Sequence, residues 1–439
     1  MVSLIALWSC NQTSSTTVGI HVKGGKPDVK PMIYTKDSTY TVDLDSIGSG
    51  KVVLANNLKA GYANLVYGRV KVQLYLEPHK SLDVSMNFEG NRMTPEFSGE
   101  GAKINEYLSK HRSGMPDFKA EEEQFIRSLE EMEKTEFAAL DTLGLDEAFV
   151  KKEKQRLHYA IFRAFPVYPS YHQYYNQLDS FEVSNAYYDY LKSLIKEDET
   201  LLDLEEYKAA LATFVQTQSL KDLESNDSFE RLKTTLDYIN NNMTNPAVVS
   251  FLVDRFVSGY VSSNGVDQLE QLAPIYNAKV TDPELKAEFE KICEKWAKVA
   301  KGQPSPTFKY LDIDGKEVSL SDLAGKYVYV DVWATWCGPC RGEIPHLKEL
   351  EKKYKDKNIY FVSISCDQDK AAWEKMVKEQ KLEGVQLHKG EDREFMETFM
   401  IRSIPRFILL DPEGKIVSAV MTRPSNPKTV ETLDALLGV

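Results

Sequence analysis

Two cysteines three positions apart, Cys337 and Cys340, are the residues of this chain whose type and spacing best suit covalent chemistry. They enclose Gly338 and Pro339 and follow an apolar run that ends at Trp333, so they fall where a strand gives way to a helix. Free backbone N–H groups and the helix dipole at such a start favour a thiolate, the attacking form of cysteine. The spacing predicts a disulfide that opens and closes, with Cys337 as the exposed nucleophile and Cys340 as the buried resolving thiol.

Three other uses of such a pair conflict with the residues around it. A zinc site needs about four ligands, and the sequence has no second Cys-x-x-Cys and no close Cys-His pair. A haem attachment needs His where Arg341 stands, and a thiol peroxidase would have Pro and Thr where Val330 and Ala334 stand. The sequence thus predicts thiol–disulfide exchange without a metal or a cofactor, and the thiol peroxidase is the weaker alternative.

The remaining cysteines, Cys10, Cys293 and Cys366, are isolated in the sequence. Five cysteines in 439 residues are too few for a disulfide scaffold. Cys293 and Cys366 fall in apolar helix or strand patterns, where a lone cysteine usually behaves as a small hydrophobic residue. We therefore expect neither of these two to react with substrates.

Cys10 ends an apolar N-terminal segment. Leu7-Trp8-Ser9-Cys10 resembles a bacterial lipobox, the cleavage and lipidation motif of lipoproteins, although no Lys or Arg precedes it. The polar residues 11–17 that follow suit a flexible tether. The resemblance implies that residues 1–10 hold a lipoprotein signal and that Cys10 carries a membrane-inserted lipid. The alternative is a frayed N-terminus with a chance cysteine.

Residues 18–100 have the pattern of short strands. Val70–Leu76 and Leu82–Phe88 largely alternate apolar and polar residues, and turn-forming residues such as Gly48-Ser49-Gly50 separate the runs. Such spacing predicts a small antiparallel sandwich or barrel. No polar residues in this region have the spacing of a catalytic site.

Helix-forming residues dominate from 101 to 301. Apolar residues at three- and four-residue spacing predict helices at Glu121–Leu140, Glu147–Phe165, Phe214–Leu223, Phe229–Ile239 and Pro283–Val299. Tyrosines crowd the segment 159–190. Such a cluster could bind a ligand, but it more often forms core and interface.

Strands and helices alternate after the proline-containing linker 302–306. Predicted strands are Tyr327–Trp333, Asn358–Ser365, Phe407–Leu410 and Lys415–Met421, and predicted helices are Pro339–Tyr354, Lys370–Gln380 and Thr429–Leu437. This order predicts an α/β domain with a central sheet over residues 303–439. The chain is therefore predicted to be multidomain, with an N-terminal antiparallel β domain, an α-helical middle domain over 101–301 and this C-terminal α/β domain.

The segment Val330–Cys340, which ends in Trp-Cys-Gly-Pro-Cys, resembles the active site of thioredoxin-fold oxidoreductases. The resemblance implies that Asp331 is the buried acid near the cysteines, with a raised pKa, and that it takes the proton from Cys340. It also implies that Pro405 is a cis-proline facing the two sulfurs. The positions expected to contact substrate are Trp336, Gly338, Pro339 and Ile404.

Glu343 adds a finer resemblance. The run Cys-Arg-Gly-Glu-Ile-Pro that starts at Cys340 is similar to the TlpA and ResA-like branch, membrane-tethered thiol–disulfide oxidoreductases of the bacterial envelope. In that branch an acid at this position tunes the active site. A solvated glutamate in the first helical turn is an equally good alternative. Trp333 and Trp336 are expected to shield the site from water by aromatic packing.

The order of the predicted parts resembles multidomain envelope proteins of the TlpA-like family, which carry a lipoprotein signal, a β domain of the DUF4369 type and a helical middle. The resemblance implies a lipid-anchored periplasmic or envelope enzyme that acts on protein thiols and disulfides and takes electrons from an upstream thiol–disulfide carrier. The Gly-Pro dipeptide favours a reductase.

The net charge of −12 argues against nucleic acid as a partner. The rival hypothesis is a binding or scaffold lipoprotein, in which residues 18–300 capture a partner.

Overall fold

The computed structural model describes residues 15–26, 28–90, 92–112 and 114–439. The chain divides into two compact units, and the boundary lies between Gln218 and Ser219. It falls inside the segment 101–301 that the sequence predicts to be one helical domain, so each unit combines helices with β structure. Cys10 lies outside the described residues, as does the rest of the predicted lipoprotein signal.

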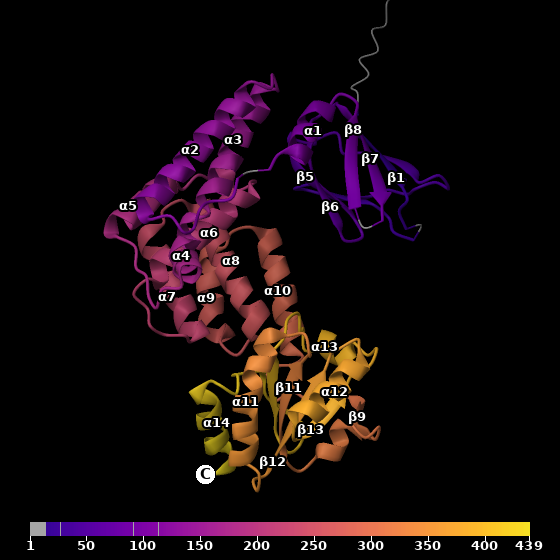
Figure 1. Ribbon diagram of the computed structural model, residues 1–439, viewed down its shortest axis with the longest axis vertical. Coiled ribbons are helices and arrows are strands. Elements are labelled where there is room, and N and C mark those ends of the chain that lie inside the picture. Colours follow the sequence, from indigo (N-terminus) through magenta and orange to yellow (C-terminus); the bar gives the residue numbers. More distant parts are fainter. Residues whose placement is uncertain (1–14, 27, 91, 113) are drawn as a thin grey trace, which may run out of the picture. The chain divides into compact units, whose positions relative to one another are not determined.

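In the described part of unit 1, two four-stranded sheets form a sandwich (Figure 1). The strand orders are β4-β1-β7-β8 and β3-β2-β5-β6. The strands are β1 (Thr17–Lys23), β2 (Met32–Tyr34), β3 (Thr39–Thr41), β4 (Ser49–Val53), β5 (Gly61–Tyr67), β6 (Val70–Leu76), β7 (Ser81–Glu89) and β8 (Arg92–Ser98). Residues from both sheets, among them Ile20, Leu65, Leu74 and Val84, are fully buried in one core, as the alternating pattern predicts.

One strand pair departs from the predicted antiparallel arrangement. β1 pairs with β7 in parallel, from Thr17 opposite Ser81 to Lys23 opposite Asn87. Between these two strands the chain crosses to the second sheet for β2 and β3, returns to the first for β4, and crosses again for β5 and β6. A connection of that length lets a strand enter the sheet in either direction, whereas a short hairpin allows only the antiparallel one.

The helices of unit 1 follow this sandwich, and a buried polar network joins two of them to it. They are α1 (Ala102–Lys110), α2 (Glu122–Asp141), α3 (Glu147–Phe162), α4 (Tyr168–Asn176), α5 (Asn185–Leu194) and α6 (Glu205–Leu220). The fully buried Glu153 of α3 accepts hydrogen bonds from Tyr62 of β5 and Tyr107 of α1. Arg156 donates two more to the same carboxylate, each at 2.7 Å. The network therefore joins β5, α1 and α3 in one place.

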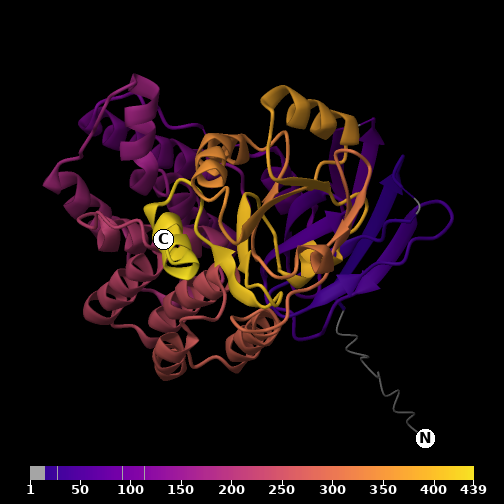
Figure 2. The ribbon, with the colours of Figure 1, turned by 90° about the horizontal axis from the view of Figure 1, so that it is seen from below.

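In the described part of unit 2, seven strands form one sheet in the order β10-β9-β13-β12-β11-β14-β15. Figure 2 shows the yellow C-terminal helix beside strands of this sheet. The strands are β9 (Lys309–Asp312), β10 (Glu317–Ser319), β11 (Tyr327–Trp333), β12 (Ile359–Ser365), β13 (Val385–His388), β14 (Arg406–Leu410) and β15 (Ile416–Met421). The helices around them are α11 (Gly338–Lys353), α12 (Lys370–Gln380), α13 (Glu394–Thr398) and α14 (Pro427–Leu437). β11 is parallel to β12 and antiparallel to β14. The central strand ends where α11 begins, as the sequence predicts.

Unit 2 also contains the helices that precede this sheet. They are α7 (Ser228–Asn242), α8 (Pro246–Asn264), α9 (Leu269–Lys279) and α10 (Pro283–Ala297). α8 contacts β15, and Asp227 at the start of α7 pairs with Lys428 of α14 at 2.7 Å. The Gly302 N–H donates to the Ile416 carbonyl at 2.7 Å. The sheet and these helices are therefore packed as one body.

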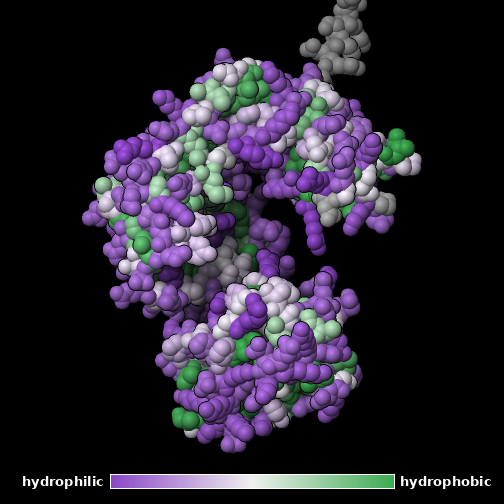
Figure 3. All heavy atoms as spheres, viewed as in Figure 1, coloured by the Kyte–Doolittle hydropathy of each residue, from purple (hydrophilic) through white to green (hydrophobic). Residues whose placement is uncertain are grey.

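Hydrophilic side chains cover most of the face of each unit that Figure 3 shows, and hydrophobic side chains occur there in small patches. The large apolar residues are concentrated in the cores. Within the described ranges, no helix combines the length and the apolar character that crossing a bilayer requires.

Candidate active site at the start of helix α11

Cys337 and Cys340 form a disulfide at the first turn of α11. Cys337 is the N-cap residue, and the backbone N–H of Cys340 donates to its Sγ at 3.1 Å. The same donor and the helix dipole stabilise a thiolate there once the bond is reduced. Both cysteines are buried, at 5% and 4% exposure, so the expectation of an exposed Cys337 is wrong for the disulfide form. Closing the bond holds the Cys337 sulfur in an apolar cluster with Trp333 and Ala334.

Trp336, Gly338 and Pro339 are exposed around this disulfide, where a substrate would approach. Trp336 has 70% of its surface exposed, so the expectation that it shields the sulfurs by packing is wrong. It lies in the short loop between β11 and α11, and residues of such loops commonly face solvent. Trp333, at 2% exposure, is the tryptophan that packs against the cysteines.

Asp367 fixes the loop that carries Cys337, and the sequence motif did not point to it. Its carboxylate accepts hydrogen bonds from the Thr335 hydroxyl at 2.7 Å and from the Thr335 backbone N–H at 3.0 Å. The Ser365 hydroxyl donates to it at 2.8 Å. Asp367 comes just after β12, and the carboxyl ends of neighbouring parallel strands meet at one edge of a sheet. That placement is the pattern by which sequence reasoning could have found it.

Asp331 lies on β11, two residues before Trp333 and therefore on the same face of the strand. It is buried, as the resemblance implies. Burial raises its pKa to about 8, and the negative charges of Glu343 and Glu351 add to the effect. At neutral pH the carboxyl group is mostly protonated, and it can exchange a proton within the physiological pH range.

A cavity of about 10 Å³ lies between Asp331 and a second carboxyl group, that of Glu351 on α11. Burial and the charge of Glu383 raise the pKa of Glu351 to about 7, against the opposing effect of Lys348. Gln386, whose buried Oε1 has no hydrogen-bond partner among the described residues, also lines the cavity. A space of this size and polarity suits about one water molecule, which would link the two carboxyl groups. Nothing in the spacing of Asp331 and Glu351 along the sequence indicated this proximity.

Glu343 is buried rather than solvated, which contradicts the alternative of a free first-turn glutamate. Its carboxylate accepts hydrogen bonds from the Ser425 backbone N–H at 3.0 Å and from the Ser425 hydroxyl at 2.9 Å. Arg423 approaches it to 3.9 Å but is more than half exposed, so this ion pair is weak. Glu343 thus joins α11 to the loop between β15 and α14, and its charge raises the pKa of Asp331.

The peptide bond between Ile404 and Pro405 is cis, as the resemblance implies, and it comes just before β14. β14 is the antiparallel neighbour of β11, the strand that leads to the cysteines. Ile404 packs against the apolar cluster that contains Cys337 and Cys340. The structure therefore brings residues 404–405 close to the disulfide, although the two segments are far apart in the sequence.

Cys293 and Cys366 are half-buried and have no disulfide partner. Burial raises the pKa of both thiols, and at Cys366 the carboxylate of Asp367 adds to the increase. A thiol with a raised pKa is a poor nucleophile at neutral pH, which agrees with the expectation that neither cysteine reacts. Among the residues that the structure describes, no three His, Cys, Asp or Glu side chains are grouped closely enough to hold a metal ion.

Comparisons with known proteins place this site in a wider context. Residues 300–437 match the Redoxin family. Thiol-disulfide oxidoreductase ResA of Bacillus cereus is 33% identical over 137 residues, which are 31% of this chain and 76% of that protein. ResA of Bacillus subtilis (strain 168) is 30% identical over 28% of this chain and 68% of its own. A Bacteroides vulgatus protein of known solution structure is 63% identical over 32% of this chain and 93% of its own, with a TM-score of 0.30.

Proposed function

Because the chain belongs to the ResA-like family of thiol–disulfide oxidoreductases, we propose that it reduces disulfide bonds of protein substrates outside the cytoplasm. One observation supports this most. Cys337 and Cys340 form a disulfide at the start of α11, and the strand that leads to them carries the buried acid Asp331. A helix start that favours a thiolate, a second sulfur and a nearby proton acceptor are what disulfide exchange requires.

The proposed reaction has two steps. The Cys337 thiolate attacks one sulfur of the substrate disulfide, forms a mixed disulfide and releases the first substrate thiolate. Cys340 then loses its proton to the Asp331 carboxylate, attacks Cys337 Sγ and releases the second substrate thiolate. The substrate gains the two electrons of the couple, and the enzyme is left as the Cys337–Cys340 disulfide. An upstream dithiol carrier must reduce that disulfide before the next cycle.

The direction of the reaction is inferred from Gly338 and Pro339 between the cysteines. This dipeptide resembles that of thioredoxin, so we expect a reduction potential nearer to about −270 mV than to the −120 mV of a DsbA-type oxidant. Equilibration with glutathione or dithiothreitol buffers measures it. A value above about −160 mV would mean that the enzyme oxidises its substrates.

The proposed location is the bacterial cell envelope, with a lipid on Cys10. The support is the lipobox-like run Leu7–Cys10 and the polar residues that follow it. Mass spectrometry of the protein from its native membrane should show loss of residues 1–9 and a diacylglyceryl group on Cys10. An intact Met1 on the native polypeptide would exclude this anchoring.

Reduction of insulin disulfides in the presence of dithiothreitol tests the activity. Cys337→Ser should abolish it, because the attacking sulfur is lost. Cys366→Ser is the matched control, since it makes the same change at a half-buried cysteine that has no disulfide partner, and it should stay active. Full activity of Cys337→Ser would remove the basis of the proposal.

Trapping identifies the substrates. Cys340→Ser lacks the resolving sulfur, so in the native envelope it should accumulate adducts with other proteins that dithiothreitol releases. Cys337→Ser combined with Cys340→Ser should lose all of them. If Cys340→Ser traps nothing under oxidising conditions, protein disulfides are not the substrate, and a binding protein with an ancillary redox domain becomes the better hypothesis.

A further inference from the structure

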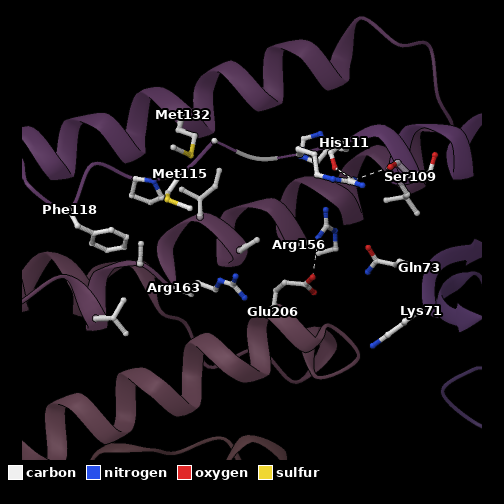
Figure 4. A pocket seen from close by; sticks show the side chains of 18 of the residues that line it. Lys71, Gln73, Ser109, His111, Met115, Phe118, Met132, Arg156, Arg163 and Glu206 are labelled. Carbon is white, nitrogen blue, oxygen red and sulfur yellow. Dashed lines mark hydrogen bonds and ion pairs between the residues drawn. The ribbon is translucent and has the colours of Figure 1, made fainter. Parts of the chain in front are cut away.

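Unit 1 contains a cleft of about 930 Å³ that no step of the redox reaction uses. Residues of β6, β8, α1, α2, α3, α4 and α6 line it, together with the segment between α1 and α2. The network around Glu153 fixes α1 and α3 against the sandwich, so the cleft is preformed. Figure 4 shows Lys71 and Gln73 on one side of this space and Arg163 and Glu206 on the other.

The charge of the cleft is opposite to that of the chain. The whole chain has a net charge of −12, yet the cleft is lined by Lys71, Arg112, Arg156 and Arg163 with Glu206 as their acidic counterpart. Arg156 is paired with Glu206 at 2.9 Å and with Glu153. Among the described residues, no carboxylate lies within ion-pair distance of the Lys71 or Arg163 side chain. Since Lys71 and Arg163 have no acidic partner there, their positive charges attract an anionic ligand into the cleft.

The edge of a sheet also faces this cleft. In the described part of the chain, β6 is the last strand of its sheet and pairs there with β5 alone. Farther along β6, the Tyr75 backbone N–H and carbonyl point away from β5, because both are bonded to the Asn105 side chain. Along an antiparallel strand, the direction of the backbone N–H and carbonyl groups reverses at each residue. Gln73 and Lys71 lie two and four residues before Tyr75, so their backbone groups point in the same direction as those of Tyr75. Lys71 and Gln73 line the cleft, so a free strand edge is available to an extended peptide there.

Apolar side chains complete the lining. The rings of Phe118 and Tyr171 lie 4.9 Å apart, and Tyr171 stacks on Tyr175 at 5.9 Å. Tyr171 and Tyr175 remain nearly half exposed, and Met115, drawn beside Met132 in Figure 4, is 87% exposed. Exposed aromatic rings and flexible methionines adapt to differing apolar side chains, which is typical of surfaces that bind several polypeptides.

We propose that this cleft binds an extended, acidic segment of another polypeptide. The segment adds a strand to the free edge of β6 at Lys71–Gln73, and its carboxylates pair with Lys71 and Arg163. A small anion would use the cations without the strand edge, whereas an extended peptide uses both. The proposal goes beyond the redox function and does not depend on it, since it involves neither cysteine.

Fluorescence anisotropy with defined peptides tests it on the full chain. The probes are a fluorescein-labelled peptide of alternating Glu and Val, its Gln counterpart, and the Glu peptide with alternate backbone N–H groups methylated. We expect the Glu peptide to bind at least about tenfold more tightly than the Gln peptide, because its charges are matched. Methylation should weaken binding at least about fivefold, because it removes the donors that pair with β6.

Protein variants with reversed charges provide a second test of the proposal. Lys71→Glu combined with Arg163→Glu should weaken binding of the Glu peptide by about tenfold or more. Lys51→Glu combined with Lys134→Glu makes the same charge change at exposed positions outside the cleft and should leave the affinity unchanged. Cys337→Ser should also bind as the unmodified chain does, which separates this result from a failure of the redox proposal.

Several results would overturn the proposal. Equal affinities for the Glu and Gln peptides, or equal binding by the two charge-reversal variants, would exclude recognition by these cations. Unchanged binding of the methylated peptide would exclude strand addition. No change in anisotropy with any peptide up to about 1 mM would exclude a peptide site altogether. The peptide comparisons need only the unmodified chain, so a variant that fails to fold leaves the test intact.

Discussion

At Asp331, burial and the charges of Glu343 and Glu351 act in the same direction and raise the pKa of the side chain to about 8. The carboxylate that can accept a proton from Cys340 therefore becomes more abundant as the pH rises through that value. We expect resolution of the mixed disulfide to accelerate over the same range. Asp331→Asn should slow resolution by about 100-fold or more and remove this pH dependence. Stopped-flow kinetics can separate the two steps, and equal slowing of formation and resolution would contradict proton transfer by Asp331.

The same buried carboxyl group makes folding less favourable as the pH rises. Its pKa is about 8 in the folded chain and about 3.9 in an unfolded one. Between these values the folded state holds a proton that the unfolded state has lost, so the free energy of unfolding falls as the pH rises. Asp331→Asn should raise the free energy of unfolding at neutral pH by roughly 2–4 kcal/mol and flatten its dependence on pH. Urea denaturation over a pH series measures this, and a less stable Asn variant at neutral pH would contradict it.

Glu351 shares the small cavity with Asp331, and its charge is one cause of the raised pKa there. Glu351→Gln removes that charge, so the pH at which resolution accelerates should shift downward. Glu349→Gln is the matched control, because it makes the same change on an exposed position of the same helix. Equal pH profiles for the two variants would show that Glu351 does not act on Asp331.

The sequence predicts a site residue only where the role of that residue follows from its spacing to neighbouring residues in the chain. The cysteine pair, Asp331 and the cis bond at Pro405 all follow from motifs with fixed spacing, and the structure places them in one domain around a disulfide. Glu351 could not be predicted, because its relevance depends on which helix face meets β11. Asp367 was missed, although its position just after the predicted strand β12 was a usable signal. The exposure of Cys337 and Trp336 was predicted wrongly, since side-chain packing in a loop is not encoded in spacing.

At the scale of helices and strands, one buried carboxylate, that of Glu343, links α11 to the loop before α14. Glu343 accepts two hydrogen bonds from Ser425, one from its backbone and one from its hydroxyl. Glu343→Ala leaves both donors without this acceptor, so it should lower the free energy of unfolding by about 1–3 kcal/mol. Amide hydrogen exchange at Ser425 should become faster.

Ser425→Ala is the control for this link. It removes the hydroxyl bond and keeps the backbone bond, so its effect on the free energy of unfolding should be smaller than that of Glu343→Ala. If Glu343→Ala leaves hydrogen exchange at Ser425 unchanged, the two bonds do not hold the loop.

Elements with strong periodicity or clear boundaries were predicted closely, and the others were not. β11 has the predicted bounds, Tyr327–Trp333, and α12 the predicted bounds, Lys370–Gln380. The short strands β9, β10 and β13 were missed, because three or four residues carry too little pattern. α8 was missed although it has 19 residues, since a helix that is apolar on most sides lacks an amphipathic period. α6 begins at Glu205 rather than Phe214, because alanines that form helices without periodicity precede Phe214.

For the molecule as a whole, the sequence predicted the classes of the parts but not how they divide into compact units. The change from strands to helices near residue 100 and the linker at 302–306 are visible in composition, so the fold classes were predictable. The boundary at Gln218–Ser219 falls in the last turn of α6, within a run of helices of similar composition. It depends on which helices contact which sheet, and such long-range contacts leave no local mark in a single sequence.

The compact unit 219–439 implies that the redox domain is completed by helices that precede it. Trp296 of α10 is 1% exposed and lies over the guanidinium of Arg406 on β14, at 5.9 Å from ring centre to carbon. A fragment that begins at residue 303 would lose this tryptophan and leave Arg406 without its cover. The Asp227–Lys428 ion pair would be lost too, but it is partly exposed and contributes little.

We therefore expect the fragment 219–439 to be more stable than the fragment 303–439, by about 2–3 kcal/mol for the burial of one large aromatic side chain. Urea denaturation of both fragments in the disulfide form measures the difference. Trp296→Ala in the longer fragment is the control, and it should remove most of the gain. Both fragments contain Cys337, Cys340 and Asp331, so both should reduce insulin, and a difference in stability without a difference in activity would assign the preceding helices a supporting role. Equal stabilities would mean that the redox domain ends at the linker, as its composition alone suggests.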